Sequence, residues 1–382
     1  MKPMIYLDNN ATTPLAPEVF EVMRPFLTEE FGNPSSAHAM SNASAEAIAV
    51  AREQTAGFLG TENSGEIVFT SGGTESDNWA ILGTLEAFPD KKKIITTKVE
   101  HEAVRVVCEK LELNGYNVVW LDVDSNGALD RQALERELDN ETAVVSIMLA
   151  NNETGVVFPV EELSELVKSR SAAAFHVDGV NAAGKIPINL KDTKIDLFSI
   201  SGHKFHGPKG SGALYIRDGV RIASNSIGGG QESGRRAGTE AVHQIAGLGA
   251  AAELASDLTP MNNVSKLRNH LEQTILQDIP NTSVTGETSP RIPNTSNVAF
   301  EGLNGELILA GLNEEGICVS TGSACNEANH VSSPVLRAMD IPYSKAMGTI
   351  RFSLGRQNTR EEIDQVIPTL KKVVSSAQVI AS

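Results

Sequence analysis

The chain has few cysteines, no excess of positive charge and no long apolar run. Its three cysteines, Cys108, Cys318 and Cys325, are too few and too scattered for a disulfide framework or a four-ligand zinc site, so a reducing compartment is the simpler reading. The formal net charge of −16 disfavours a sequence-independent nucleic-acid binder or a protein that binds anionic membranes, because both need a basic face. Residues 1–10 contain no secretory h-region and no later stretch is long enough to span a bilayer. We therefore expect a cytoplasmic protein.

The length and composition fit a large globular protein. The sequence has 382 residues, of which 41% are hydrophobic and 21% charged, the balance of an ordinary soluble protein that can bury a large core. A chain of this length suggests two domains, or one large domain with an appendage.

Residues 66–216 alternate short β-branched runs with longer amphipathic stretches. This pattern is typical of parallel strands joined by crossover helices, and several runs are apolar on both faces, as strands covered on both sides should be. The predicted strands are residues 66–70, 93–97, 117–121, 143–148, 174–177, 197–200 and 213–216. The predicted helices in and around them are residues 41–59, 75–85, 102–113, 160–168 and 239–258. We expect an α/β fold whose seven-stranded, mostly parallel sheet is covered by helices.

The composition shifts after residue 258, where a helix at 262–277 precedes short strands at 297–300, 317–320 and 349–353. This mixture predicts a smaller α+β domain. Thr359 and Glu362 form a capping box for a last helix, inside which Pro368 should cause a kink or a division. We predict a large domain at 15–258, and a small domain made of 1–14 and 259–382.

Candidate ligand-binding residues follow the predicted strands. In α/β sheets ligands bind beyond the carboxyl ends of the strands, where helix N-termini offer free N–H groups. Ser71 to Ser76 follow the first strand and could hold a phosphate, although a plain capped turn explains them equally. His101 follows the second strand, where a structural imidazole is the commoner case. Asp178 ends a strand that reads as buried, so it needs a partner, or else caps a helix.

Lys204 lies in the segment SGHKFHGPKG after the strand at 197–200. A lysine at this depth is a candidate for a Schiff base, whereas most lysines are solvated. A glycine-rich loop at 228–239 carries Arg235 and Arg236, and is either an anion-binding loop or a connector. Together an anion cradle, an aspartate, a histidine and a lysine on one sheet suit pyridoxal phosphate. A nicotinamide or nucleotide site fits less well, because G-x-G-x-x-G is absent from the first strand-to-helix turn and no Walker A sequence occurs.

Ten separated motifs then agree with one family. YLDNNATT, FGNPSS, FTSGGTES, VEHEAV, ANNETG, HVDG, SGHKFHGPKG, GRRAGT, STGSAC and IRFSLGR resemble, in order and spacing, the cysteine desulfurases of the NifS and IscS type, closest to the NifS branch. The resemblance covers essentially the whole chain. It implies the class V aminotransferase family, fold type I, pyridoxal 5'-phosphate as cofactor and a homodimer.

The resemblance also implies roles for individual residues. Lys204 would bind the cofactor aldehyde, Asp178 the ring nitrogen, and His101 would stack on the ring and act as an acid/base. Phosphate binding would fall to residues of two loops and of a second subunit: Gly73, Thr74, Ser201, His203 and, from the other subunit, Thr239. The ring hydroxyl and the substrate carboxylate would be held by Asn152, with Asn181 serving the hydroxyl and Arg351 the carboxylate.

Cys325 matches the cysteine that accepts sulfur, whereas Cys108 and Cys318 lie in apolar periodic runs and should pack as small hydrophobic residues. No resident metal site is predicted, and Cys325 is the one residue that could ligate an iron–sulfur cluster, transiently. Two positions depart from the family. Asn181 replaces the usual Gln and is one methylene shorter, and Asn326-Glu327 replaces the usual Thr-Ser after Cys325, which puts acceptor preference at risk.

The implied reaction removes sulfur from L-cysteine and leaves L-alanine and a Cys325 persulfide, which passes to acceptors for iron–sulfur cluster assembly. Transfer RNA thiolation and DNA phosphorothioation remain alternative destinations, and the negative charge favours a protein acceptor over direct contact with nucleic acid. The rival functions are a selenocysteine lyase or an aminotransferase on the same fold, and a non-enzymatic scaffold that has kept it.

Overall fold

The structure is a computed structural model that describes residues 4–321 and 332–381. A seven-stranded sheet forms its centre, with strand order β2-β8-β7-β6-β5-β3-β4. The strands are β2 (Ile67–Thr70), β3 (Lys93–Thr97), β4 (Asn117–Leu121), β5 (Thr142–Ser146), β6 (Ala174–Asp178), β7 (Leu197–Ser201) and β8 (Gly212–Ile216). Neighbours are parallel except that β8 runs against both β2 and β7. The predicted seven-stranded, mostly parallel sheet is confirmed.

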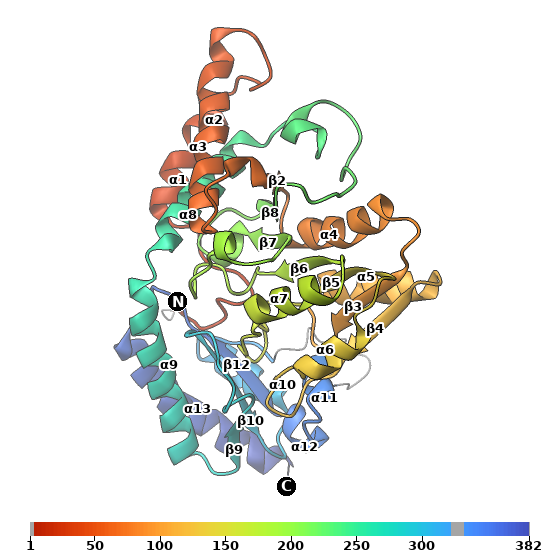
Figure 1. Ribbon diagram of the computed structural model, residues 1–382. Coiled ribbons are helices and arrows are strands. Elements are labelled where there is room, and N and C mark those ends of the chain that lie inside the picture. The colour runs from red at the N-terminus through yellow and green to blue at the C-terminus, as the bar shows by residue number, and fades with distance from the viewer. Residues whose placement is uncertain (1–3, 322–331, 382) are drawn as a thin grey trace.

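Helices cover both faces of this sheet. The α-helices up to residue 256 are α1 (Pro17–Met23), α2 (Pro25–Thr28), α3 (Asn42–Phe58), α4 (Gly73–Ala87), α5 (Glu102–Leu113), α6 (Arg131–Glu137), α7 (Val160–Arg170) and α8 (Val242–Ser256), of which α2 buries no residue. Helices α4 and α5 share one apolar core with the sheet, and α1, α3, α7 and α8 share another. Figure 1 places α1 to α3 at one end of the molecule and the elements after α8 at the other.

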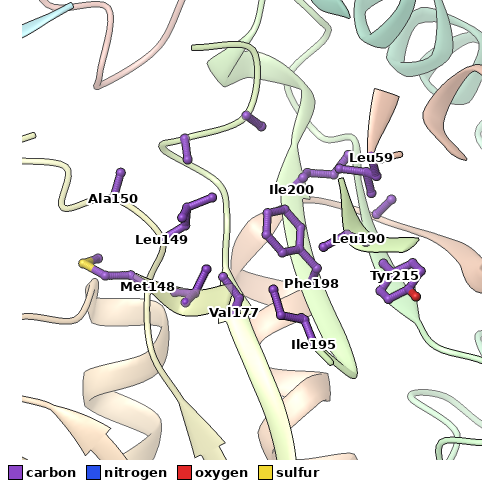
Figure 2. Packing of buried hydrophobic residues seen from close by; sticks show 14 of the residues in the cluster. Leu59, Met148, Leu149, Ala150, Val177, Leu190, Ile195, Phe198, Ile200 and Tyr215 are labelled. Atoms are coloured by element: carbon purple, nitrogen blue, oxygen red, sulfur yellow. The ribbon is translucent and has the colours of Figure 1, made fainter. Parts of the chain in front are cut away.

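The apolar packing on the second of these faces is dense. Phe198 and Ile200 of β7 point into a cluster with Val177 of β6 and Leu190, as Figure 2 shows. Phe198 is fully buried, and a Cβ atom at Gly179 would lie only 2.0 Å from its ring. Gly179 is therefore required where β6 leaves the sheet.

The segment after α8 builds a third core together with the N-terminal residues Ile5 and Leu7. Its elements are α9 (Thr259–Asp278), β9 (Thr282–Val284), β10 (Thr295–Phe300), α10 (Gly305–Glu314), β11 (Ile317–Cys318), α11 (Pro334–Ala338), α12 (Tyr343–Ala346), β12 (Thr349–Ser353) and α13 (Arg360–Ala381). Strand β10 lies between β12 and β9, and β1 (Ile5–Tyr6) pairs with β11. The predicted domain boundaries at 14 and 258 stay a prediction.

Several predicted boundaries differ from the observed ones. The strand predicted at 143–148 ends at Ser146, and Glu66 precedes β2 with its carboxylate buried and bonded to the N–H of Asp218 at 2.8 Å. The strand predicted at 317–320 is two residues long. Helix α9 begins at Thr259, so Pro260 occupies its first turn, where the missing N–H costs nothing.

The last helix keeps its predicted cap, and of the kink or division predicted at Pro368 the division does not occur. Thr359 and Glu362 bond each other's backbone N–H at 3.1 and 3.2 Å, which confirms the capping box. Helix α13 nevertheless continues through Pro368, because Ile363, Val366, Leu370 and Val374 are buried on both sides of it and their packing offsets the lost hydrogen bond. No helix in residues 4–321 and 332–381 combines the length and apolarity needed to cross a bilayer.

Candidate active site

Five parallel strands bring the sequence-predicted residues to one edge of the large sheet. β2, β3, β5, β6 and β7 share a direction, so the loops after them meet at their carboxyl ends. The strand ends and the segments that follow them carry nine of the predicted residues: Gly73, Thr74, His101, Asn152, Asp178, Asn181, Ser201, His203 and Lys204. Arg351 comes from β12 of the smaller sheet, and Cys325 lies outside the described residues.

The loop between β2 and α4 forms a tight cradle. Helix α4 has no side-chain N-cap, so its first N–H groups are open to a ligand. Gly72 has φ of 152°, and a Cβ atom at Gly212 would lie 2.6 Å from the Gly72 Cα atom, so only glycine fits at this crossing. The Ser201 hydroxyl lies 3.6 Å from where a Cβ atom of Gly72 would stand. An uncapped helix N-terminus with a hydroxyl beside it suits a phosphate group.

His203 borders the same loops. Its Nδ1 atom lies 3.2 Å from the Thr12 hydroxyl. Burial, followed by the charge of Lys204, lowers the pKa of His203 to about 4. The imidazole is therefore neutral at pH 7 and would meet a phosphate as a hydrogen-bonding group rather than as a cation.

Lys204 ends the turn that follows β7 and is held by the N-terminal segment. Its Nζ donates to the carbonyl oxygen of Asn10 and to that of Ala11 at 3.2 Å. Burial and the charge of Arg351 lower the pKa of Lys204 to about 8, while Asp178 and Asp8 oppose the shift. A neutral, nucleophilic amine is consequently accessible near neutral pH.

Asp178 is the last residue of β6 and is 5% exposed. One carboxylate oxygen accepts the N–H of Val180 at 2.9 Å, and no lysine or arginine among the described residues forms an ion pair with it. Burial, and then the nearby Asp77, raise the pKa of Asp178 to about 6, against the opposing charge of His101. A buried carboxylate with this little compensation can receive a cationic N–H, such as a protonated ring nitrogen.

His101 is exposed and caps helix α5. Its Nδ1 accepts the N–H of Ala103 at 3.1 Å, so this atom has the structural role that is the commoner case for a histidine. Since Nδ1 accepts, a neutral ring carries its proton on Nε2. The ring is then a capping group on one side and a potential proton donor on the other.

Arg351 and Asn152 lie together on the side of the smaller sheet. The Asn152 carbonyl oxygen accepts from Arg351 Nη1 at 3.0 Å and from the Asn10 side chain at 3.1 Å. Arg351 Nη2 also pairs with Asp8 at 2.6 Å. Because the Asn10 backbone also receives Lys204, Asn10 ties the lysine to the arginine.

The side chain of Asn181 is bonded to Lys185 and to the Asn151 backbone, and not free for the cofactor hydroxyl that it was predicted to contact. The Asn181 side-chain oxygen accepts from Lys185 Nζ at 2.9 Å, and its nitrogen donates to the Asn151 carbonyl at 3.1 Å. Burial, followed by the charge of Lys204, holds the pKa of Lys185 well below its usual range. Sequence reasoning missed Lys185, although a lysine inside the apolar run VNAAGKIPI signals a buried amine.

The two arginines of the glycine-rich loop at 228–239 are engaged within the chain. Arg235 donates to the Gly65 carbonyl at 2.9 Å, and Arg236 pairs with Glu75 at 3.0 Å, so both guanidinium groups have partners within the chain. Thr239 is exposed on the same loop, and its predicted part in a second subunit's site stays a prediction. Cys108 is fully buried as predicted, whereas Cys318 is only half-buried.

Comparisons with known proteins agree with this geometry. The aminotransferase class-V family model matches residues 5–366. A cysteine desulfurase from Nostoc sp. is 52% identical over 380 residues, which are 99% of this chain and 94% of that protein. Cysteine desulfurase NifS from Azotobacter vinelandii is 49% identical over 373 residues, covering 97% and 92%. The solved structure of a NifS-like protein superposes with a TM-score of 0.90 at 38% identity, covering 99% and 100%.

The chain therefore belongs to the aminotransferase class-V family, whose members are pyridoxal-phosphate-dependent enzymes. The relatives that it matches over nearly its full length identify the group within this family. It is an enzyme of the cysteine desulfurase type, in the NifS-like group, with the α/β architecture of that group.

Proposed function

We propose that this enzyme removes the sulfur of L-cysteine, with pyridoxal 5'-phosphate held at the carboxyl edge of the large sheet. The observation that carries the proposal is the Lys204 amine, whose pKa is lowered to about 8 by burial and by the charge of Arg351. The uncapped N-terminus of α4 lies at the same edge. Amine, acid and anion site are the three groups that this cofactor needs.

The residues present suit the cofactor with one exception. Lys204 would hold its aldehyde, Asp178 its ring nitrogen, and Gly73, Thr74, Ser201 and His203 its phosphate, with Thr239 arriving from a second copy of the chain. His101 would cover the ring and Asn152 would face the ring hydroxyl. Asn181 is the exception, because its amide already bonds Lys185 and the Asn151 carbonyl. When bound, the cofactor supplies an electron sink for the bond-breaking at the substrate's Cα and Cβ atoms.

The protein's own groups then divide the remaining work. Arg351 and Asn152 would orient the substrate by its carboxylate, and the Lys204 amine would move the proton at Cα. The Cys325 thiolate would attack the substrate sulfur, so that an S–S bond forms while the Cβ–S bond breaks. The products are L-alanine and a Cys325 persulfide, which together balance the atoms of L-cysteine and the enzyme thiol.

We further propose that the persulfide passes to a protein acceptor that assembles iron–sulfur clusters, in the cytoplasm and from a homodimer. The net charge of −16 supports an acceptor with a basic docking surface, and disfavours direct sulfur transfer to nucleic acid. Transient ligation of a cluster by Cys325 belongs to the same proposal. We also propose that residues 15–258 form a large domain, and that residues 1–14 and 259–382 form a small one.

Replacing Cys325 by Ala tests the reaction. We expect the variant to bind cofactor and L-cysteine as the wild type does, but to form no persulfide and to lose about 10²-fold or more in alanine production. Replacing Cys108, which is buried, by Ala is the matched control and should leave turnover intact. Release of sulfide from L-cysteine at the wild-type rate by the Cys325 variant would contradict the proposal and favour a lyase that needs no thiol.

A further inference from the structure

The guanidinium group of Arg351 is only partly satisfied. Its side chain is 6% exposed, with Nη1 bonded to the Asn152 carbonyl oxygen at 3.0 Å and Nη2 bonded to Asp8 at 2.6 Å. Its Nε atom is buried and has no hydrogen-bond partner in the described part of the chain. Buried donors are nearly always paired, so an orphan N–H of a cation needs an explanation.

The orphan atom lies on the edge that Asp8 uses. In the planar guanidinium, Nε and Nη2 point to the same side and together form the two-donor edge that a carboxylate bridges. Asp8 takes Nη2 alone, so it fills half of this edge. Asp8 is also the more exposed partner, at 20%. A carboxylate that reached both nitrogens would satisfy a donor that Asp8 leaves free.

The neighbouring strand β10 also carries a buried polar side chain without hydrogen-bond partners in the described residues, and it lies beside Arg351. Asn297 of β10 lies directly opposite Arg351 in the register with β12, is fully buried, and has no hydrogen-bond partner for either amide atom within the described residues. Two positions along the register, the pair Thr295 and Ser353 is fully used, since its hydroxyls bond Asn10 at 2.8 and 3.0 Å. Unmet polar groups thus gather around Arg351 and nowhere else in this row.

Lys204 is connected to Arg351 through shared hydrogen-bond partners. The Asn152 carbonyl oxygen joins Arg351 to Asn10, and the Asn10 backbone oxygen receives the Lys204 amine. The charges of Arg351 and of Asp8, which occupies that edge, both act on the Lys204 amine, so a molecule that holds its carboxylate there lies beside the reactive amine. An α-amino acid has its carboxylate and its amino group at that short spacing.

We propose that Asp8 is a placeholder for the substrate's carboxylate. It neutralises and orients the buried Arg351 in the free enzyme, and it withdraws when an α-carboxylate bridges Nε and Nη2. The inference rests on the proposed function, in which Arg351 receives that carboxylate, and adds Asp8 as a positioning residue that limits how tightly amino acids bind. The exchange is non-covalent, so no bond is made or broken.

The test compares the wild-type holoenzyme with Asp8→Asn, which keeps the shape of the side chain and removes its charge. The probe is L-alanine, whose dissociation constant is read from the visible spectrum of the bound cofactor. We expect a roughly tenfold tighter dissociation constant in Asp8→Asn, because a competing anion has gone. Ethylamine, which lacks a carboxylate, should bind both proteins equally. For L-cysteine the KM should fall far more than kcat changes.

Asp364→Asn is the matched control, because it removes a carboxylate from an exposed ion pair with Arg360 on α13 and should leave both constants alone. Asp8→Ser repeats the charge removal with another side chain. An unchanged or weaker affinity for L-alanine overturns the inference, and so does equal weakening of L-alanine and ethylamine, or failure of both Asp8 variants to fold, since these assign Asp8 to structure. A wild type that makes no L-alanine from L-cysteine would instead sink the proposed function.

Discussion

The two faces of the large sheet are built from alternate residues of the same strands, yet they differ in character. On the face toward α1, α3, α7 and α8, apolar side chains continue to the carboxyl ends of the strands, as Val177 and Ile200 show. On the face toward α4 and α5, an apolar row is followed by a buried polar row before the site is reached. The polar row consists of Thr70, Thr96, Ser146, His176 and Ser199.

Three members of the polar row, Ser146, His176 and Ser199, form a hydrogen-bonded group beneath Asp178. His176 lies 2.8 Å from the Ser146 hydroxyl and 2.9 Å from the Ser199 hydroxyl, and Asp77 of α4 approaches its Nε2 atom at 3.5 Å. Burial lowers the pKa of His176 to about 4, so the ring is neutral. The comparison teaches that one face holds the sheet together, while the other gives up apolar packing to surround the acid of the site with dipoles.

The largest expected effect comes from the end of the polar face. Lys204→Ala should lower turnover by about 10³-fold and abolish the visible absorbance of lysine-bound cofactor, because the amine is both anchor and base. The melting temperature should change little, since within the described residues Lys204 is held by backbone carbonyls alone. Exposed Lys209 gives the control, as Lys209→Ala should keep spectrum and rate. Unchanged absorbance in Lys204→Ala would contradict the assignment of Lys204, and with it the functional role of the polar face.

The apolar face should respond in the opposite way. Phe198→Ala removes a fully buried ring and should cost about 3–5 kcal/mol of unfolding free energy, while the rate per folded molecule stays close to that of the wild type. Chemical denaturation followed by circular dichroism measures the loss. Leu113, which is 88% exposed, provides the control, because Leu113→Ala should cost under about 0.5 kcal/mol. A large fall in rate with little loss of stability would mean that both faces serve the chemistry.

The sequence predicted the apolar face better than the polar one. Runs such as EIVFT and NVVWL mark strands because β-branched residues and period alone locate them, and Asp178 and Lys204 were found because they follow such runs. His176 also stands in a strand, but its partners Ser146 and Ser199 are 30 and 23 residues away. Only the register of β5, β6 and β7 brings these three together, and register depends on long-range pairing.

The same limit explains Asn181 and Asp8. The missing methylene of Asn181 is visible in the sequence, but its bonds to Lys185 and to the Asn151 carbonyl depend on how two loops pack. Asp8 is 343 residues from Arg351, and it meets the arginine because the N-terminal segment lies along β12. Local patterns therefore located the site's edge, whereas the packing of distant segments decided which atoms remain free.

The smallest expected effect tests whether Asp77, which lies beside His176 of the polar row, is charged in the folded protein. Burial raises the pKa of Asp77 to about 7, well above its usual value of 3.8, and the Ser199 hydroxyl opposes this only in part. The folded protein therefore binds more protons here than the unfolded chain between about pH 4 and pH 7, so stability falls as pH rises through that window. Asp77→Asn should be as stable as the wild type near pH 4 and more stable at pH 8.

Melting curves of both proteins at a series of pH values measure this difference. Asp90→Asn, on the exposed turn after α4, is the control and should show no pH-dependent gain. Because Asp77 also raises the pKa of Asp178, the Asp77 variant should shift the pH dependence of the cofactor spectrum to lower pH as well. If Asp77→Asn were less stable than the wild type at pH 8, Asp77 would be an ionised partner of its neighbours. The polar face would then contribute to stability as the apolar face does, and the contrast between them would be one of composition alone.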